Sequence, residues 1–157
     1  EQVLAGARAV GERWYESQTL RTLGLISLLQ GRAEHAQDEL RQSLQIAWEI
    51  EDPIGLAMDL DRLAQAAISL EQPERAVMLA AAASELRESV GGGLSLDDFR
   101  WEREHPRDSA RRILSPAQID LAWAHGRTMS LEEAVAYAQA ASVQHGLRPD
   151  HPAVAAR

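Results

Sequence analysis

Histidine is the residue type in this sequence best suited to metal binding or proton transfer, and five are present. They are His35, His105, His125, His145 and His151. No two of them have the spacing of a His-x3-His pair or an HExxH motif, which places two ligands on one helical face. The sequence has no Cys, so thiolate ligands, thiol nucleophiles and disulfides are excluded together. We therefore predict no metal site and no cofactor, with the histidines exposed or close to helix ends.

The acidic residues and serines do not form the arrangements used in catalysis either. Asp59 and Asp61 lie two positions apart on different sides of a helix, and a second acidic cluster at 49–52 stands at a helix end. Paired-carboxylate catalysis needs two groups that converge on one cleft, whereas acids on a helix surface are ordinarily solvated. No GxSxG nucleophile elbow is present. We expect solvated carboxylates, capping serines, no catalytic residue and a protein that is not an enzyme.

Arginines form the one charged pattern with two reasonable interpretations. Arg100, Arg103, Arg107 and Arg111 fall on one stripe of an ideal helix. Such a stripe could bind an anionic partner, or its members could pair with acids such as Asp97 and Asp108 on an ordinary surface helix. We favour the second interpretation, because exposed pairs indicate little by themselves and Pro106 interrupts the helix. The sequence leaves open whether a helix at 96–112 is broken there.

The net charge of −8 argues against direct binding of nucleic acid, which depends on Lys and Arg that neutralise phosphates. All 16 basic residues are Arg, which we interpret as codon bias of a GC-rich bacterial genome. The longest apolar run, 76–83, is too short to cross a membrane. No signal peptide is visible at the start of the sequence. These features predict a cytoplasmic protein with no membrane contact.

Helix signals are dense along the chain, whereas alternating strand patterns are missing. Capping boxes at 95–98, 115–118 and 130–133 predict three helix starts, and the prolines at 53 and 73 predict two more. Glycines stand where helices should end, at Gly31, Gly91, Gly126 and Gly146. Eight helices are expected near 3–15, 18–30, 33–50, 54–70, 73–90, 96–112, 116–125 and 131–144. Their short connections favour antiparallel hairpins.

A repeat with a period of about 40 residues relates two parts of the chain. Leu23-Gly24 corresponds to Leu63-Ala64, and Ala36 corresponds to Ala76. Small residues recur where two helices of a hairpin must approach closely, and larger apolar residues recur where the next hairpin packs. Two helices per repeat at this period are typical of a helical solenoid.

The spacing within each unit resembles the tetratricopeptide repeat. Leu23-Gly24, Ala36, Leu40 and Ser43 match the family's leucine-glycine, alanine, aromatic and alanine positions. The period exceeds the usual ~34 residues, and Leu40 and Ala80 replace the expected aromatic residues. The resemblance implies a right-handed superhelix of antiparallel hairpins, whose concave face is lined by the first helix of each unit. It places seven binding residues on that face: Gln18, Arg21, Leu25, Leu29, Asp61, Gln65 and Ser69.

A more specific resemblance lies near the end of the chain. The stretch 121–138, LAWAHGRTMSLEEAVAYA, resembles the AWxxGRxLSLEEAVxxA stretch that closes the helical-repeat region of large bacterial LuxR/MalT-like ATP-dependent transcriptional regulators. The segment 80–91 is similar to a second stretch of that group, and together the resemblance covers about residues 20–140. In this group a nucleotide-binding module typically precedes the repeats and a LuxR-type helix-turn-helix often follows. The interruption at Pro106 is a departure from the family.

These observations predict one all-α domain over 1–157, an antiparallel helix-hairpin solenoid with a helical C-terminal cap. A leading helix at 1–17 is followed by two tetratricopeptide-like units at 18–90. A glycine hinge separates these units from capping helices at 91–145, in which Trp123 is expected to be a buried anchor. A linker or tail is expected at 146–157. The function that we expect is non-catalytic binding of a peptide, protein or small-molecule effector, with contacts to other domains of the same polypeptide. The alternative is a stand-alone assembly scaffold. Pairing with a second copy of the chain stays open.

Overall fold

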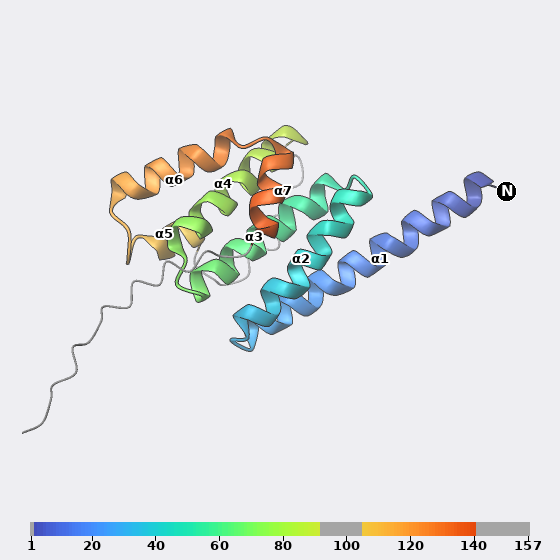
Figure 1. The fold of residues 1–157 in the computed structure, drawn as a ribbon, viewed down its shortest axis with the longest axis horizontal. Helices are drawn as coiled ribbons and strands as arrows, with labels where there is room; N and C mark the ends of the chain where they lie inside the picture. Colours follow the sequence, from blue (N-terminus) through green and yellow to red (C-terminus); the bar gives the residue numbers. More distant parts are fainter. Residues whose placement is uncertain (1, 92–104, 141–157) are drawn as a thin grey trace, which may run out of the picture.

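The computed structural model describes residues 2–91 and 105–140, and every regular element in these two ranges is an α-helix (Figure 1). In chain order the helices are α1 (Gln2–Leu29), α2 (Ala33–Glu49), α3 (Pro53–Ser69), α4 (Pro73–Ser89), α5 (Pro106–Ala110), α6 (Pro116–Thr128) and α7 (Leu131–Gln139). The predicted all-helical class is confirmed for this part of the chain. The hinge beyond Gly91, the first part of the helix expected at 96–112 and the tail after 140 lie outside the described residues. None of the described helices is long and apolar enough to cross a membrane.

Three successive helix ends have the same turn, and this turn sets the hairpin geometry. The amides of Arg32, Asp52 and Gln72 donate to carbonyls five residues back, at 2.9, 2.9 and 2.8 Å. The residue before each amide has a positive φ: 74° at Gly31, 54° at Glu51 and 57° at Glu71. This is the Schellman motif, in which one left-handed residue reverses the chain after a helix. Because α2, α3 and α4 each have 17 residues, the left-handed residue recurs every 20 positions, at 31, 51 and 71.

Two of these turns use Glu where the backbone favours glycine. A side chain in the left-handed region costs about 1–2 kcal/mol, part of which glycine loses again through its greater freedom in the unfolded chain. We therefore expect Glu51→Gly and Glu71→Gly each to raise the free energy of unfolding by about 0.5–1 kcal/mol, measured by urea denaturation. Gln42→Gly is the matched control, because Gln42 is exposed in the interior of α2 and should lose about 1 kcal/mol. A lower free energy of unfolding for Glu51→Gly and Glu71→Gly would contradict the interpretation that these turns favour glycine.

Three predicted helix boundaries are wrong. The helix expected at 131–144 ends at Gln139, because the backbone of Ala140 is already extended. The helices expected at 3–15 and 18–30 are one helix, α1, because neither proline nor glycine stands between them and Ser17 turns inward to bond Ser43. The helix expected to end at 125 continues to Thr128. Gly126 lies inside it, where a Cβ atom would be 2.4 Å from the backbone oxygen of Met78. Its glycine therefore permits close contact between α6 and α4 and does not end the helix.

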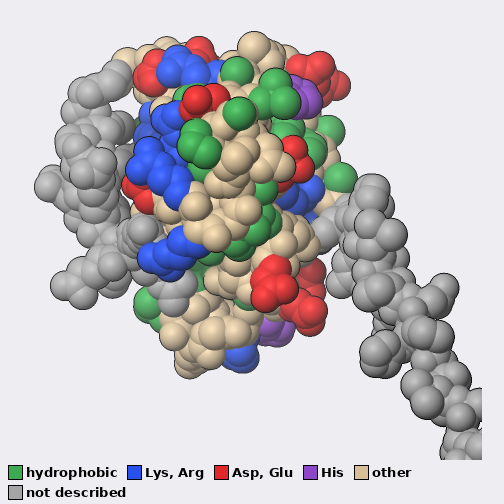
Figure 2. All heavy atoms as spheres, turned by 90° about the vertical axis from the view of Figure 1, so that its left-hand side faces the viewer, with side chains coloured by type: hydrophobic (Ala, Val, Ile, Leu, Met, Phe, Trp, Pro, Cys, Tyr) green, Lys and Arg blue, Asp and Glu red, His purple; other side chains and the backbone are tan. Residues whose placement is uncertain are grey.

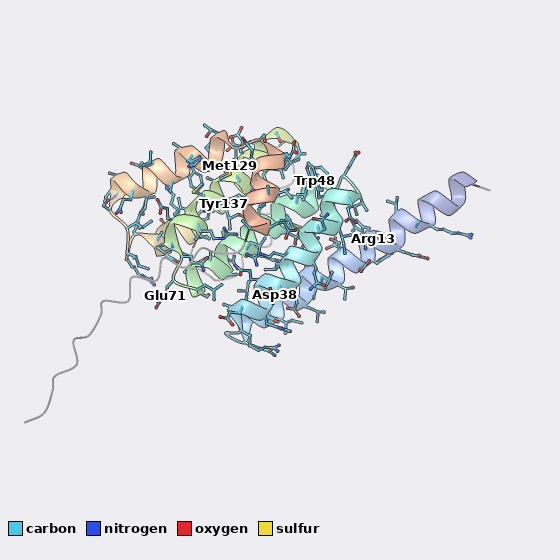
Figure 3. The ribbon with its side chains drawn as sticks, viewed as in Figure 1. Arg13, Asp38, Trp48, Glu71, Met129 and Tyr137 are labelled. Atoms are coloured by element: carbon cyan, nitrogen blue, oxygen red, sulfur yellow. The ribbon has the colours of Figure 1, made fainter. Side chains whose placement is uncertain are left out.

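Neighbouring helices pack as hairpins around one alanine- and leucine-rich core. α1 packs on α2, α2 on α3, and α3 on α4, and the buried residues Leu40, Leu60 and Leu79 lie where these layers meet. α5 and α6 then pack on α4, and α7 crosses α4 and α2 (Figure 1). The first part of α1 extends beyond this stack (Figure 1). Figure 3 shows Arg13 beside the last turn of α2, where its guanidinium pairs with Glu49.

The capping boxes predicted at Ser115 and Ser130 are both present and start α6 and α7. α7 is held at its other end by two arginines from the hairpins. Arg41 donates to the carbonyls of residues 138 and 140 at 3.1 and 2.8 Å, and Arg75 donates to the carbonyls of residues 137, 138 and 140 at 2.9–3.0 Å. The guanidinium of Arg75 also lies 4.8 Å from the ring centroid of Tyr137, and Figure 3 shows Tyr137 on α7. Cations at the last carbonyls of a helix favour its dipole, so α7 is fixed across α2 and α4.

Candidate interaction surface on α1 and α3

The first helices of the two hairpins, α1 and α3, lie side by side. Residues that occupy the same place in the 40-residue register have similar exposure along one stripe of each helix. Trp14 and Ile54 are both 39% exposed, and Gln18 and Met58 are both half-buried. Leu25 and Gln65 are half-buried, and Leu29 and Ser69 are exposed; the exception is Arg21, which is buried where Asp61 is half-buried. We call this surface the α1–α3 face: Trp14, Gln18, Leu25 and Leu29 of α1, and Ile54, Met58, Asp61, Gln65 and Ser69 of α3.

Six of the seven residues predicted to bind a partner lie on the α1–α3 face, exposed or half-buried. Leu29 is the most open apolar member, at 52% exposure. The seventh, Arg21, is not on the surface, because its side chain is 1% exposed. Sequence reasoning missed Trp14, Ile54 and Met58, although the register that placed Leu29 and Gln65 could have found them.

Arg21 lies beneath the α1–α3 face in a fully buried ion pair with Asp59. Its Nε and Nη2 atoms donate to the two carboxylate oxygens of Asp59 at 2.7 and 2.9 Å. The hydroxyl of Ser43 donates to the same carboxylate at 2.8 Å, and the Nη1 atom of Arg21 donates to the side-chain oxygen of Gln18 at 2.6 Å. The expectation that Asp59 is solvated is therefore wrong. Its partner comes from a helix far away in sequence, and this pairing satisfies a buried charge.

The surroundings of this pair shift two pKa values. Burial raises the pKa of Asp59, an effect opposed by the hydrogen bonds and charge of Arg21 and by the Ser43 hydroxyl. Burial and the neighbouring Arg21 lower the pKa of Arg62, whose guanidinium donates to the backbone oxygen of Arg21 at 3.1 Å. Gly55 leaves the space for Arg21, since a Cβ atom there would lie 2.7 Å from its Nη2 atom. The pair thus joins α1, α2 and α3 and holds the two helices of the face in register.

The charged residue of the α1–α3 face, Asp61, forms an ion pair with a side chain of α4. The partner is Arg87, and both side chains are about 30% exposed. Ser69 donates to the backbone oxygen of Gln65 at 3.3 Å within α3. The remaining surface is apolar and amide-bearing, so its chemistry suits contact with another polypeptide surface and not the transfer of a proton.

The arginine row of the sequence does not form a free cationic surface where it is described. Pro106 starts α5, with the His105 ring accepting from the amide of Arg107 at 3.2 Å, so a helix begins at the proline. Arg107 pairs with Asp120 at 3.1 Å, and its guanidinium lies 4.7 Å from the ring centroid of Trp123. Trp123, expected to be a buried anchor, is half-buried and packs against the core. Arg111 pairs with Asp108 at 2.9 Å, as the surface-helix interpretation predicts. Figure 2 shows basic and acidic side chains mixed on this end of the molecule.

Within residues 2–91 and 105–140, no group of three or more His, Asp or Glu side chains could hold a metal ion. Comparison with known proteins adds no relative. No protein-family model matches the sequence, and neither a curated protein nor a solved structure matches it.

Proposed function

We propose that this chain is a tetratricopeptide-like, non-catalytic binding module that presents the α1–α3 face to a peptide or protein. One observation carries the proposal: two neighbouring first helices expose large side chains along the same stripe. Trp14, Leu29 and Ile54 are each between 39% and 52% exposed on it. Exposed aromatic and aliphatic side chains that lie close together, with polar groups between them, are typical of protein-binding surfaces.

The hairpin packing supports the tetratricopeptide-like part of the proposal. Gly24 holds the position of the family's small residue, and a Cβ atom there would lie 2.6 Å from the Cγ atom of Leu40. Close helix contact at this position is what the repeat spacing requires, and α2, α3 and α4 follow one another at a constant interval. In repeat arrays each unit contacts its neighbours and the first helices form a continuous surface.

The binding surface can be tested by photocrosslinking in cells that express the full-length protein. We expect a photoreactive phenylalanine analogue at Leu29 or at Gln65 to give a discrete crosslinked product. The control positions are Gln42 on α2 and Ala124 on α6, which are exposed but lie outside the face. Equal yields at all four positions would contradict the proposal, because a specific surface must crosslink more strongly than unrelated exposed sites.

The larger proposal, a sensor domain of a bacterial LuxR/MalT-like regulator in the cytoplasm, is supported by the stretch at 121–138. In such a protein, occupation of the α1–α3 face would change packing against ATPase and DNA-binding parts of the same polypeptide. The test is removal of residues 18–90 from the full-length protein, with reporter transcription measured with and without inducer. An unchanged inducer response would contradict the regulatory role and leave the assembly scaffold as the better interpretation.

A further inference from the structure

A second stripe of α1 differs sharply in exposure from its counterpart on α3. We call it the outer stripe and define it as Tyr15, Thr19, Leu23 and Ile26. The residues at the same register positions on α3 are Gly55, Asp59, Leu63 and Ala66. Every member of the outer stripe is exposed, with Tyr15 at 69%, Leu23 at 43% and Ile26 at 41%. Every counterpart on α3 is buried, and Leu63 and Ala66 are 1% and 0% exposed.

The counterparts on α3 are buried because the preceding hairpin covers them. α2 packs against α3, and Ser43 of α2 donates its hydroxyl to Asp59. Leu40 and Leu44 of α2 share one core cluster with Leu63 of α3. The outer stripe of α1 therefore has the position of a repeat interface, but no described helix lies on it.

We propose that the outer stripe of α1 is a docking surface for the second helix of another helical hairpin of the same design as α1 and α2. The occupant is identified from the chain itself. One unit later, the corresponding stripe of α3 is covered by α2, the second helix of the preceding hairpin. The proposal concerns a different side of α1 from the α1–α3 face and does not rest on the function proposed for that face.

The chemistry of the outer stripe defines its partner helix further. Where α3 has the buried carboxylate of Asp59, α1 has Thr19, whose hydroxyl donates to the backbone oxygen of Tyr15 at 2.8 Å. The four residues of the stripe are therefore uncharged, with the exposed acids Glu12 and Glu16 beside them, and the partner needs no buried cation opposite Thr19. A helix with leucine, alanine and serine at positions i, i+3, i+4 and i+7, as α2 has at Leu40, Ser43, Leu44 and Ala47, fits it. It would run antiparallel to α1, as α2 does to α3.

The test supplies such a hairpin to the complete chain. A copy of residues 13–52 is joined ahead of Glu1 through a flexible Gly/Ser linker of about 20 residues, which gives an effective concentration near the millimolar range. The copy carries Arg21→Met, because the outer stripe has Thr19 and no carboxylate where α3 has Asp59 as the partner of Arg21. Because the sequence has no Cys, a single Ile26→Cys substitution in the original α1 reports on the outer stripe through its rate of reaction with a maleimide. We expect this rate to fall about tenfold or more in the extended chain, because the thiol then reacts only after local opening.

Two control variants distinguish docking from other effects. Gln42→Cys in the original α2 should react equally fast with and without the added hairpin, because Gln42 faces away from the core. Leu23→Glu, combined with Ile26→Cys in the original α1, should restore fast labelling of the introduced thiol in the extended chain, because it places a charge on the docking surface. This charge lies on an exposed position, so the original fold should be retained.

Two results would overturn the proposal. The first is equally fast labelling of the Ile26→Cys variant in the extended and original chains, together with a separate unfolding transition of the added hairpin in urea. The second is slow, concentration-dependent labelling of the Ile26→Cys variant of the original chain with a dimeric mass by light scattering, which would assign the outer stripe to a second copy of this chain. Crosslinking from Leu29 is independent of both results, so the function proposed for the α1–α3 face can fail or hold separately.

Discussion

Asp59→Leu is expected to lower the free energy of unfolding by about 3–5 kcal/mol, the range for removing one partner of a buried ion pair. The side chains of Asp59 and Arg21 are 0% and 1% exposed, so water cannot replace the lost carboxylate. The guanidinium of Arg21 would keep the side chains of Gln18 and Ser17 as partners, at 2.6 and 3.2 Å, but no counter-charge. Arg21→Met should cost a similar amount, because it leaves the carboxylate of Asp59 buried with Ser43 as its remaining donor.

The double variant Arg21→Met with Asp59→Leu separates the pair from its surroundings. Replacing a whole buried ion pair by apolar residues of similar volume is often neutral or stabilising. We therefore expect the double variant to regain most of the loss, since the hydroxyl of Ser43, freed from Asp59, can donate to the backbone oxygen of Ser17, which lies 3.0 Å away. Urea denaturation followed by circular dichroism measures all three variants. Additive losses in the double variant would contradict the charge-pair explanation.

The general architecture follows from local signals that the sequence carries openly. Pro53 and Pro73 at helix starts, Ser115 and Ser130 with their capping partners, and glycine at 31 mark boundaries that the structure confirms. Each of these signals acts within a few residues, so no knowledge of tertiary contacts is needed to interpret it. The 40-residue register then placed the stripe that contains Leu29 and Gln65 on the surface.

The features that sequence reasoning missed depend on contacts between distant residues. Asp59 has the pattern of a surface acid, and only the approach of Arg21 from another helix makes its burial favourable. The backbone of Glu51 is left-handed, a conformation that a glutamate rarely adopts, because the packing of α2 on α3 requires the chain to reverse there. In both cases tertiary context overrides a local preference. The break predicted within α1 has a different origin, because no proline or glycine stands at 16–17 to end a helix there.

The exposure differences between equivalent residues carry more functional information than either residue type or motif. Trp14 and Ile54 have equal exposure because both first helices present the same stripe outward. Leu23 and Leu63 are the same amino acid at the same register position, yet they are 43% and 1% exposed. Equivalent residues of the two units can therefore be compared directly, because α3 shows how exposed this stripe of α1 would be if another helix covered it.

Gly126→Ala is expected to destabilise the fold by about 2 kcal/mol, although alanine is the better helix former by about 1 kcal/mol. Gly126 is buried in α6, and an added Cβ atom would lie 2.4 Å from the backbone oxygen of Met78 and 2.7 Å from the Cβ atom of Ala81. A backbone oxygen cannot rotate away as a side chain can, so α6 must move off α4. That movement loosens the cluster of Val77, Ile119 and Ala122 that joins the two helices.

Gly11→Ala is the matched control for this substitution. Gly11 also lies within a helix, but nothing stands within 4 Å of an added Cβ atom, so only the gain in helix propensity should remain. We expect Gly11→Ala to leave the urea midpoint unchanged or raise it and to increase the helical signal, whereas Gly126→Ala lowers the midpoint. The opposite sign of two identical substitutions tests the contact itself. Equal stabilisation by both would mean that α6 and α4 do not approach as closely as the geometry at Met78 requires.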